Sequence, residues 1–167
     1  ENAIHLSRLL GANKYAVHAG FLVNVRVNEL GARIEGGVLF DREKALSRFK
    51  KGWMRLQEAA GDDIKLYIEN NVLSHINRLA SNNGNPLLFT EFEGYQELRA
   101  ITEFTPLIDL AHLKVSSNSL GLDFLKQVRL LRSLTDYFHV SGNNGLADEN
   151  SGCSRHRYPE LFLNSPL

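Results

Sequence analysis

Several features that directly identify the class of a protein are scarce in this sequence. Its 167 residues include one Cys, one Trp, one Met and four Pro, and 19 basic side chains balance 19 acidic ones. A single Cys excludes a disulfide framework, and zero net charge argues against binding of nucleic acid through a basic surface. No apolar run approaches the ~20 residues of a membrane helix, and residues 1–11 lack the order of a signal peptide. These absences predict a globular, cytoplasmic protein.

What is present is an alternation of short apolar runs and amphipathic segments. The short runs have the length and composition of buried strands, and they span residues 14–18, 64–68, 105–110 and 136–140. Helical spacing of apolar side chains marks residues 3–10, 41–60, 90–101 and 122–134. Asp41 is the expected N-cap of the second helix and Gly11 the expected C-cap of the first. Strands and helices that alternate at this spacing predict an α/β fold with a parallel sheet.

Polar side chains follow every predicted strand. They are His18, then Glu69, then Asp109 with His112, then His139, with Asp148 and Asn150 on the last loop. The carboxyl ends of parallel strands form one rim, so we expect these side chains to converge. Any one of them has an ordinary explanation, such as a helix cap or a buried histidine bonded to a carbonyl. Together they are the residue types that bind a divalent metal, and buried ionisable groups are costly unless paired or metal-bound.

Five segments in chain order carry a resemblance to a known superfamily. They span residues 10–20, 66–71, 107–112, 137–141 and 143–150, and include an Asp-x-x-His element and a His-x-Ser loop that leads to Asp-x-Asn. In these segments the sequence resembles the xylose isomerase-like (β/α)8 barrels, which comprise sugar epimerases, sugar-phosphate isomerases and endonuclease IV-type repair enzymes. The resemblance implies a partial TIM barrel over residues 1–150, from about strand 4 to strand 7. Residues 151–167 show no periodicity and are expected to form an irregular tail.

The resemblance also implies roles for individual residues. Glu69, Asp109 and His139 match the positions that hold one divalent metal (Mn, Zn, Mg or Co) in the epimerases, and Glu69 would also move the substrate proton. His18, His112 and Asp148 match positions that hold further metals in the nuclease branch. His112 is also expected to contact the substrate or support the metal shell. The expected substrate-binding residues are Asn71, Arg26 and Asn150.

Three functions follow as hypotheses. The first is metal-dependent isomerisation or epimerisation of a sugar or sugar phosphate by proton transfer next to a carbonyl. The second is phosphodiester cleavage of the endonuclease IV kind, which Asn150 and the neutral net charge oppose. The third is a truncated, non-catalytic barrel that serves as a binding or assembly module, because the eighth-strand Glu of the family cannot be found. A full barrel takes ~250 residues, so association into a homo-oligomer is one way in which the chain could complete it.

Overall fold

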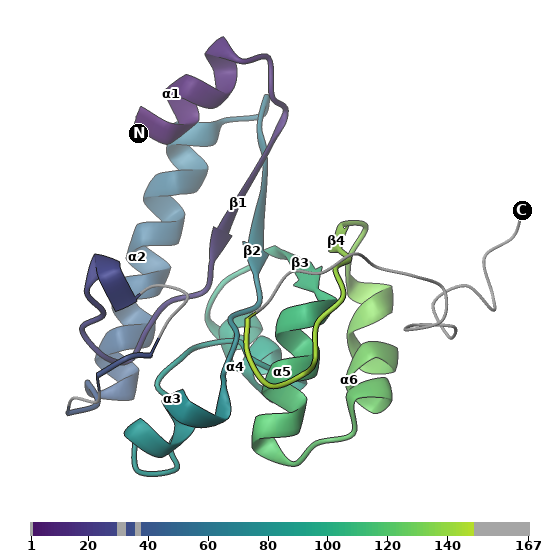
Figure 1. Cartoon of the computed structure of the whole chain (residues 1–167). Helices are drawn as coiled ribbons and strands as arrows, with labels where there is room; N and C mark the ends of the chain where they lie inside the picture. Colours follow the sequence, from purple (N-terminus) through teal and green to yellow (C-terminus); the bar gives the residue numbers. More distant parts are fainter. Residues whose placement is uncertain (1, 30–32, 36–37, 149–167) are drawn as a thin grey trace, which may run out of the picture.

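The described part of the chain is built around one parallel sheet (Figure 1). The computed structural model describes residues 2–29, 33–35 and 38–148. The strands lie side by side in chain order and neighbouring strands run parallel. They are β1 (Lys14–His18), β2 (Lys65–Glu69), β3 (Thr105–Asp109) and β4 (Phe138–His139). The predicted α/β class with a parallel sheet is therefore confirmed.

Helices flank and connect the strands within the same residues. The α-helices are α1 (Asn2–Leu9), α2 (Arg42–Ala60), α3 (His75–Ala80), α4 (Phe92–Ile101), α5 (Leu110–Leu120) and α6 (Phe124–Leu131). Short 3-10 turns cover η1 (Val27–Glu29) and η2 (Arg132–Leu134). Helix α2 begins where expected, because the Asp41 side chain accepts a hydrogen bond from the backbone N–H of Lys44 at 2.9 Å. It ends at Gly61, whose φ of 60° lies in the region that favours glycine.

Two elements differ from the sequence-based expectation. Helix α5 begins directly after β3, where the pattern predicts only the end of a strand. Most of its residues are buried, including Ser116, Ser117 and Ser119, so it lacks the apolar stripe by which a surface helix is found. Strand β4 is limited to Phe138–His139, because only Ile108 and Asp109 of β3 pair with it.

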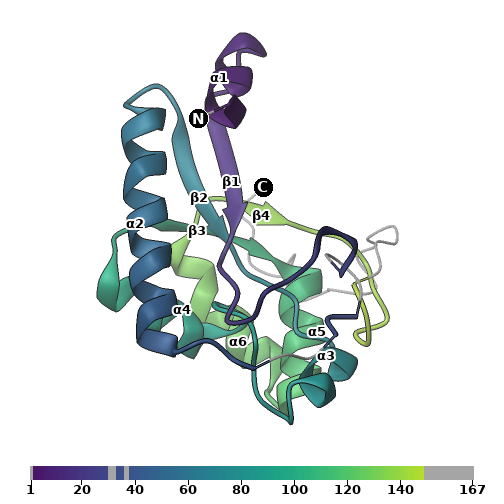
Figure 2. The same cartoon turned by 90° about the vertical axis from the view of Figure 1, so that its left-hand side faces the viewer.

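The two faces of the sheet have different partners. Val17, Ile68 and Ile108 alternate with the polar strand residues and pack into the main core, together with side chains of α2, α4, α5 and α6. In Figure 2, α2 runs alongside β1 and β2, and Trp53 of α2 is one of the buried side chains in this core. Side chains alternate between the two faces of a strand, so the polar strand residues lie on the opposite face.

Two expectations concern residues that the structure does not describe. The predicted tail over 151–167 and Asn150 lie outside the described residues, as do residues 30–32 and 36–37 between β1 and α2. Among the helices that are described, none combines the length and the apolar character that crossing a bilayer requires.

Candidate metal centre

The register of the sheet brings four predicted site residues to one face. His18 and Glu69 are directly opposite each other on β1 and β2, and Asp109 and His139 are opposite each other on β3 and β4. Glu69 pairs with Leu107, which lies two residues before Asp109 and therefore shares its face. All four side chains consequently leave the same face of the sheet near the carboxyl ends of the strands.

Glu69 lies at the centre of this group. Its carboxylate is 3.0 Å from Nδ1 of His139 and 3.8 Å from Nδ1 of His112, both measured to Oε1. The other oxygen, Oε2, lies 3.8 Å from Nε2 of His18. Glu69 is only 8% exposed, so its carboxylate is largely shielded from water and has three imidazoles around it. A buried carboxylate in such surroundings needs cations close to it, whether protons on the histidines or a metal ion.

The two carboxylate oxygens of Asp109 have different roles: one caps a helix, and the other faces the metal-ligand cluster. Oδ1 accepts a hydrogen bond from the backbone N–H of His112 at 2.9 Å and so caps α5. Oδ2 lies 3.7 Å from Nδ1 of His139. Because β3 leads directly into α5, the cap holds the Asp109 carboxyl group at the end of the strand and leaves Oδ2 for a ligand.

His112 is held at both of its ring nitrogens. Nδ1 lies 3.0 Å from the backbone carbonyl oxygen of Asn70, and Nε2 lies 3.5 Å from Oδ1 of Asp148. Burial lowers the pKa of His112, but the interaction with Asp148, the charge of Asp109 and the Asn70 carbonyl outweigh it and raise the pKa to about 9. The interaction with His112 in turn lowers the pKa of Asp148. His112 is therefore cationic at pH 7 in the metal-free chain.

His18 is in the opposite electrostatic state. Burial lowers the pKa of its imidazole, the Glu69 carboxylate raises it by less, and cationic His112 lowers it further. The two rings are tilted against each other with centroids 5.6 Å apart. His18 is thus neutral near pH 7, which is the form in which imidazole binds a metal.

Asn70 belongs to this site although sequence reasoning did not single it out. Its fully buried side chain donates to the carbonyl oxygen of Asp109 at 3.1 Å and accepts from the backbone N–H of Asp109 at 2.7 Å. Asn70 thereby ties β2 to β3 at the point where the ligands emerge. A single sequence gives no reason to assign this role to Asn70 and not to the adjacent Asn71, since both follow the same strand.

The donor set suits a divalent cation. In the part of the chain that the structure describes, two groups have ligand atoms within 4.8 Å of one another: Glu69 with Asp109 and His139, and Glu69 with His18 and His112. Mixed carboxylate oxygen and imidazole nitrogen donors fit Mn, Zn, Fe or Co. The first group can receive a metal without displacing the proton of His112, so it is the better candidate for the primary ligands.

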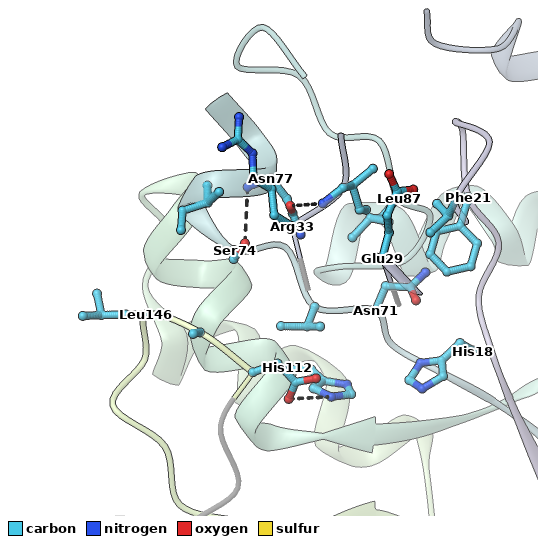
Figure 3. A pocket seen from close by; sticks show the side chains of 16 residues that line it. His18, Phe21, Glu29, Arg33, Asn71, Ser74, Asn77, Leu87, His112 and Leu146 are labelled. Carbon is cyan, nitrogen blue, oxygen red and sulfur yellow. Dashed lines mark hydrogen bonds and ion pairs between the residues drawn. The ribbon is translucent and has the colours of Figure 1, made fainter. Parts of the chain in front are cut away.

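A cavity of about 390 Å³ adjoins the cluster, and His18 and His112 lie at one end of it (Figure 3). Asp148 also lines this cavity and lies 3.5 Å from His112. Asn71 also lines this cavity, but its amide nitrogen donates to the backbone carbonyls of Ala19, Gly20 and Leu88. The amide oxygen of Asn71 accepts no hydrogen bond from the described residues, so it is available to a ligand. Arg26 is not among the lining residues. Its side chain is exposed, and its guanidinium lies 3.5 Å from the carboxylate of Glu35.

No protein-family model matches this sequence, and no curated protein matches it either. The fold and the site therefore define the class on their own: a parallel α/β protein with a carboxylate and imidazole cluster at the strand ends that could bind a metal.

Proposed function

We propose that this chain carries the metal centre of a divalent-metal-dependent isomerase or epimerase that acts on a sugar or sugar phosphate. The observation that carries the proposal is the position of Glu69, which lies within 3.8 Å of three imidazoles and shares a potential ligand group with Asp109. The resemblance to xylose isomerase-like barrels supports it. So does the order of the strands, each beside the next in the chain, with the core helices packed on one face.

Glu69, Asp109 and His139 would hold the metal. When bound, such a cation polarises a carbonyl and stabilises the negative charge that develops on its oxygen. Asp109 presents Oδ2, since Oδ1 caps α5. His139 presents Nδ1, which lies 3.0 Å from Glu69 and 3.7 Å from Asp109.

Glu69 would move the proton. Its carboxylate takes the proton from the carbon next to the carbonyl, and the electron pair of the broken C–H bond shifts into a C–C double bond while the carbonyl electrons move to oxygen. In an isomerisation, Glu69 returns this proton to the former carbonyl carbon, and the hydroxyl proton of the neighbouring carbon passes to the former carbonyl oxygen, so that the carbonyl moves by one carbon. In an epimerisation, water delivers a proton to the opposite face of the first carbon, the electrons on oxygen re-form the carbonyl, and Glu69 releases the proton that it took to solvent.

His112 would stabilise the charged intermediate. Its cationic ring lies 3.8 Å from Glu69, and the Asn70 carbonyl and Asp148 keep the ring in place. A fixed positive charge next to the reacting carbon favours the state in which negative charge has moved onto the substrate oxygen. His112 therefore contributes through electrostatics in addition to any contact with the substrate.

The test is metal binding followed by proton exchange. Mn²⁺ affinity, measured by electron paramagnetic resonance, should fall in Glu69→Gln by more than the ~10–100-fold that loss of an outer-shell partner costs. The matched control is Glu58→Gln, because Glu58 is an exposed residue of α2. Loaded chain should exchange the substrate α-proton with deuterated solvent. Absence of bound metal after incubation with Mn²⁺, Zn²⁺ or Mg²⁺ would refute the proposal.

One observation favours a second candidate, metal-dependent phosphodiester cleavage. His18 and His112 form a further potential ligand group with Glu69, and Asp148 lies beside His112. These are the residues whose positions match the additional metals of the nuclease branch. Binding to a duplex that contains an abasic site should then weaken steeply as salt rises. An affinity that does not change with salt would exclude this candidate.

A further inference from the structure

The sheet has two open edges within the described residues. Its strand order is β1-β2-β3-β4, so β1 and β4 each pair with one neighbour. Asn13 and Ala19, at the two ends of β1, bond to β2 through their backbone groups, and these groups alternate in direction along a strand. The N–H and C=O groups of Lys14, Ala16 and His18 therefore point away from β2. Such a row of backbone groups is a template for pairing with another strand.

The sheet is curved toward the face that carries the ligand cluster. Neighbouring strands lie about 4.8 Å apart, so β1 and β4 would be separated by roughly 14 Å in a flat sheet. Nζ of Lys14, on β1, lies only 4.8 Å from the centre of the Tyr137 ring, next to β4. Lys65 of β2 likewise reaches Asp136, at 2.8 Å. A parallel sheet with this curvature, and with its core helices on one face, has the geometry of a barrel wall.

Uncovered apolar side chains flank both open edges. Before β1, they are Leu6, Leu9 and Leu10, which are 55%, 70% and 75% exposed. At the other edge, they are Leu134, Phe138 and Val140, which are 36%, 36% and 46% exposed. Groups of exposed apolar side chains mark surfaces that bind another protein. Leu10 precedes β1 and Leu134 precedes β4, so parallel pairing of these strands would bring the two apolar groups to the same end of the contact.

The partner that fits both edges is a second copy of this chain. We propose that β4 of each copy pairs in parallel with β1 of the other, so that two copies close an eight-stranded barrel. Four strands from each copy give the number at which parallel strands close around an interior filled by side chains. A twofold axis along the barrel makes the two contacts identical, so no edge is left for a third copy.

The contact would also join the ligand clusters of the two copies. His18 ends β1 and His139 ends β4, so each lies at an open edge of the sheet. Pairing places His18 of the second copy beside His139, and the carboxyl ends of all strands then form one closed rim. None of these contacts requires the proposed reaction, so the association holds or fails independently of the proposed function.

Analytical ultracentrifugation of the full chain tests the association. We expect a dimer that dissociates on dilution, with a dissociation constant of about 100 µM or lower. A chain that remains monomeric at about 100 µM would overturn the proposal. Species larger than a dimer would overturn it as well, because they would show that the edges pair without closing.

Variants of α1 locate the apolar part of the contact. Leu9→Glu places a charge among the exposed leucines, and each dimer contains the change twice, so the dissociation constant should rise roughly 100-fold. The matched control is Leu79→Glu, because Leu79 is also exposed but belongs to α3, which lies at the opposite end of the molecule from α1 (Figure 1). Both positions are exposed, so neither variant is expected to unfold the chain. A dimer that is unaffected by Leu9→Glu would overturn the proposal.

A second pair of variants tests the strand edge itself. Ala16→Pro removes an N–H that points away from β2, which an edge strand tolerates, and should abolish the dimer while the monomer stays folded by circular dichroism. Ala16→Ser keeps this N–H and should preserve the dimer. A folded Ala16→Pro chain that still dimerises like its parent would overturn the proposed pairing.

Cross-linking distinguishes this dimer from one in which two β1 strands pair with each other. Chains with Leu10→Cys and chains with Leu134→Cys, both also carrying Cys153→Ser, are mixed and treated with a short bis-maleimide. Cross-linked dimer should form in the mixture and not from either chain alone. Cross-linking of the Leu10→Cys chain with itself would show that two β1 edges meet, and would overturn the proposed pairing.

Discussion

Replacing Asn70 with Ala should reveal how strongly the sheet depends on one buried amide. Asn70 has no exposed surface, and its side chain makes two hydrogen bonds to the backbone of Asp109, at 2.7 and 3.1 Å. The variant leaves a buried N–H and a buried carbonyl of Asp109 without these partners. An unsatisfied buried group costs about 1–3 kcal/mol, so we expect the free energy of unfolding to fall by about 2–6 kcal/mol. That is a large share of the ~5–15 kcal/mol available to a domain.

Urea unfolding of the metal-free chain measures this loss, with an unchanged dependence on denaturant as evidence that one cooperative transition is still observed. The matched control is Asn24→Ala, because Asn24 is an exposed Asn, and its effect should stay within about 0.5 kcal/mol. The variant should also bind Mn²⁺ about 10- to 100-fold more weakly, since Asp109 loses the partner that orients it. An unfolding free energy within 0.5 kcal/mol of the parent would contradict the role assigned to Asn70.

Two further predictions concern the site and the core. The His112 pKa of about 9 exceeds its ordinary value of 6.5, so its stabilising contribution of about 3 kcal/mol is complete below pH 6.5 and lost as the pH rises through 9. In Asp148→Asn the pKa of His112 should fall, and an NMR titration that shows the same pKa in both chains would contradict the pairing at 3.5 Å. Trp53→Phe should lower stability by about 1–3 kcal/mol, because the buried indole N–H donates to a backbone carbonyl before β3 at 3.1 Å. Thermal unfolding measures this loss, and an unchanged midpoint would refute it.

Local chemistry explains why much of the fold could be predicted. Short apolar runs bounded by turn residues predict β1, β2 and β3 to within about one residue at either end. Asp41 caps α2 through its own side chain, and Gly61 ends that helix with a positive φ, so both boundaries depend on the neighbouring residues alone. The sequence also predicts which residue types follow the strands, and hence the kind of ligand they could bind.

Other features depend on contacts between distant segments. The sequence pattern does not predict helix α5. Its serines are buried against neighbouring elements and do not form a solvent-facing side, so apolar and polar residues do not alternate with the period of a helix. Asn70 and Asn71 are adjacent and chemically identical, yet one ties β2 to β3 and the other holds the loops after β1 and α3. The difference arises from which backbone groups lie opposite each side chain.

The sequence by itself determined strands β1 to β3, the capped helix α2 and the acidic and imidazole side chains at the strand ends. Only the tertiary structure decided that Glu69 lies among three histidines, that His112 is cationic while His18 is neutral, and that a cavity adjoins these two rings. The physical reason is that strand pairing sets the register between residues far apart in the chain, and register sets the distances. Burial and charge at those distances then determine protonation and ligand binding.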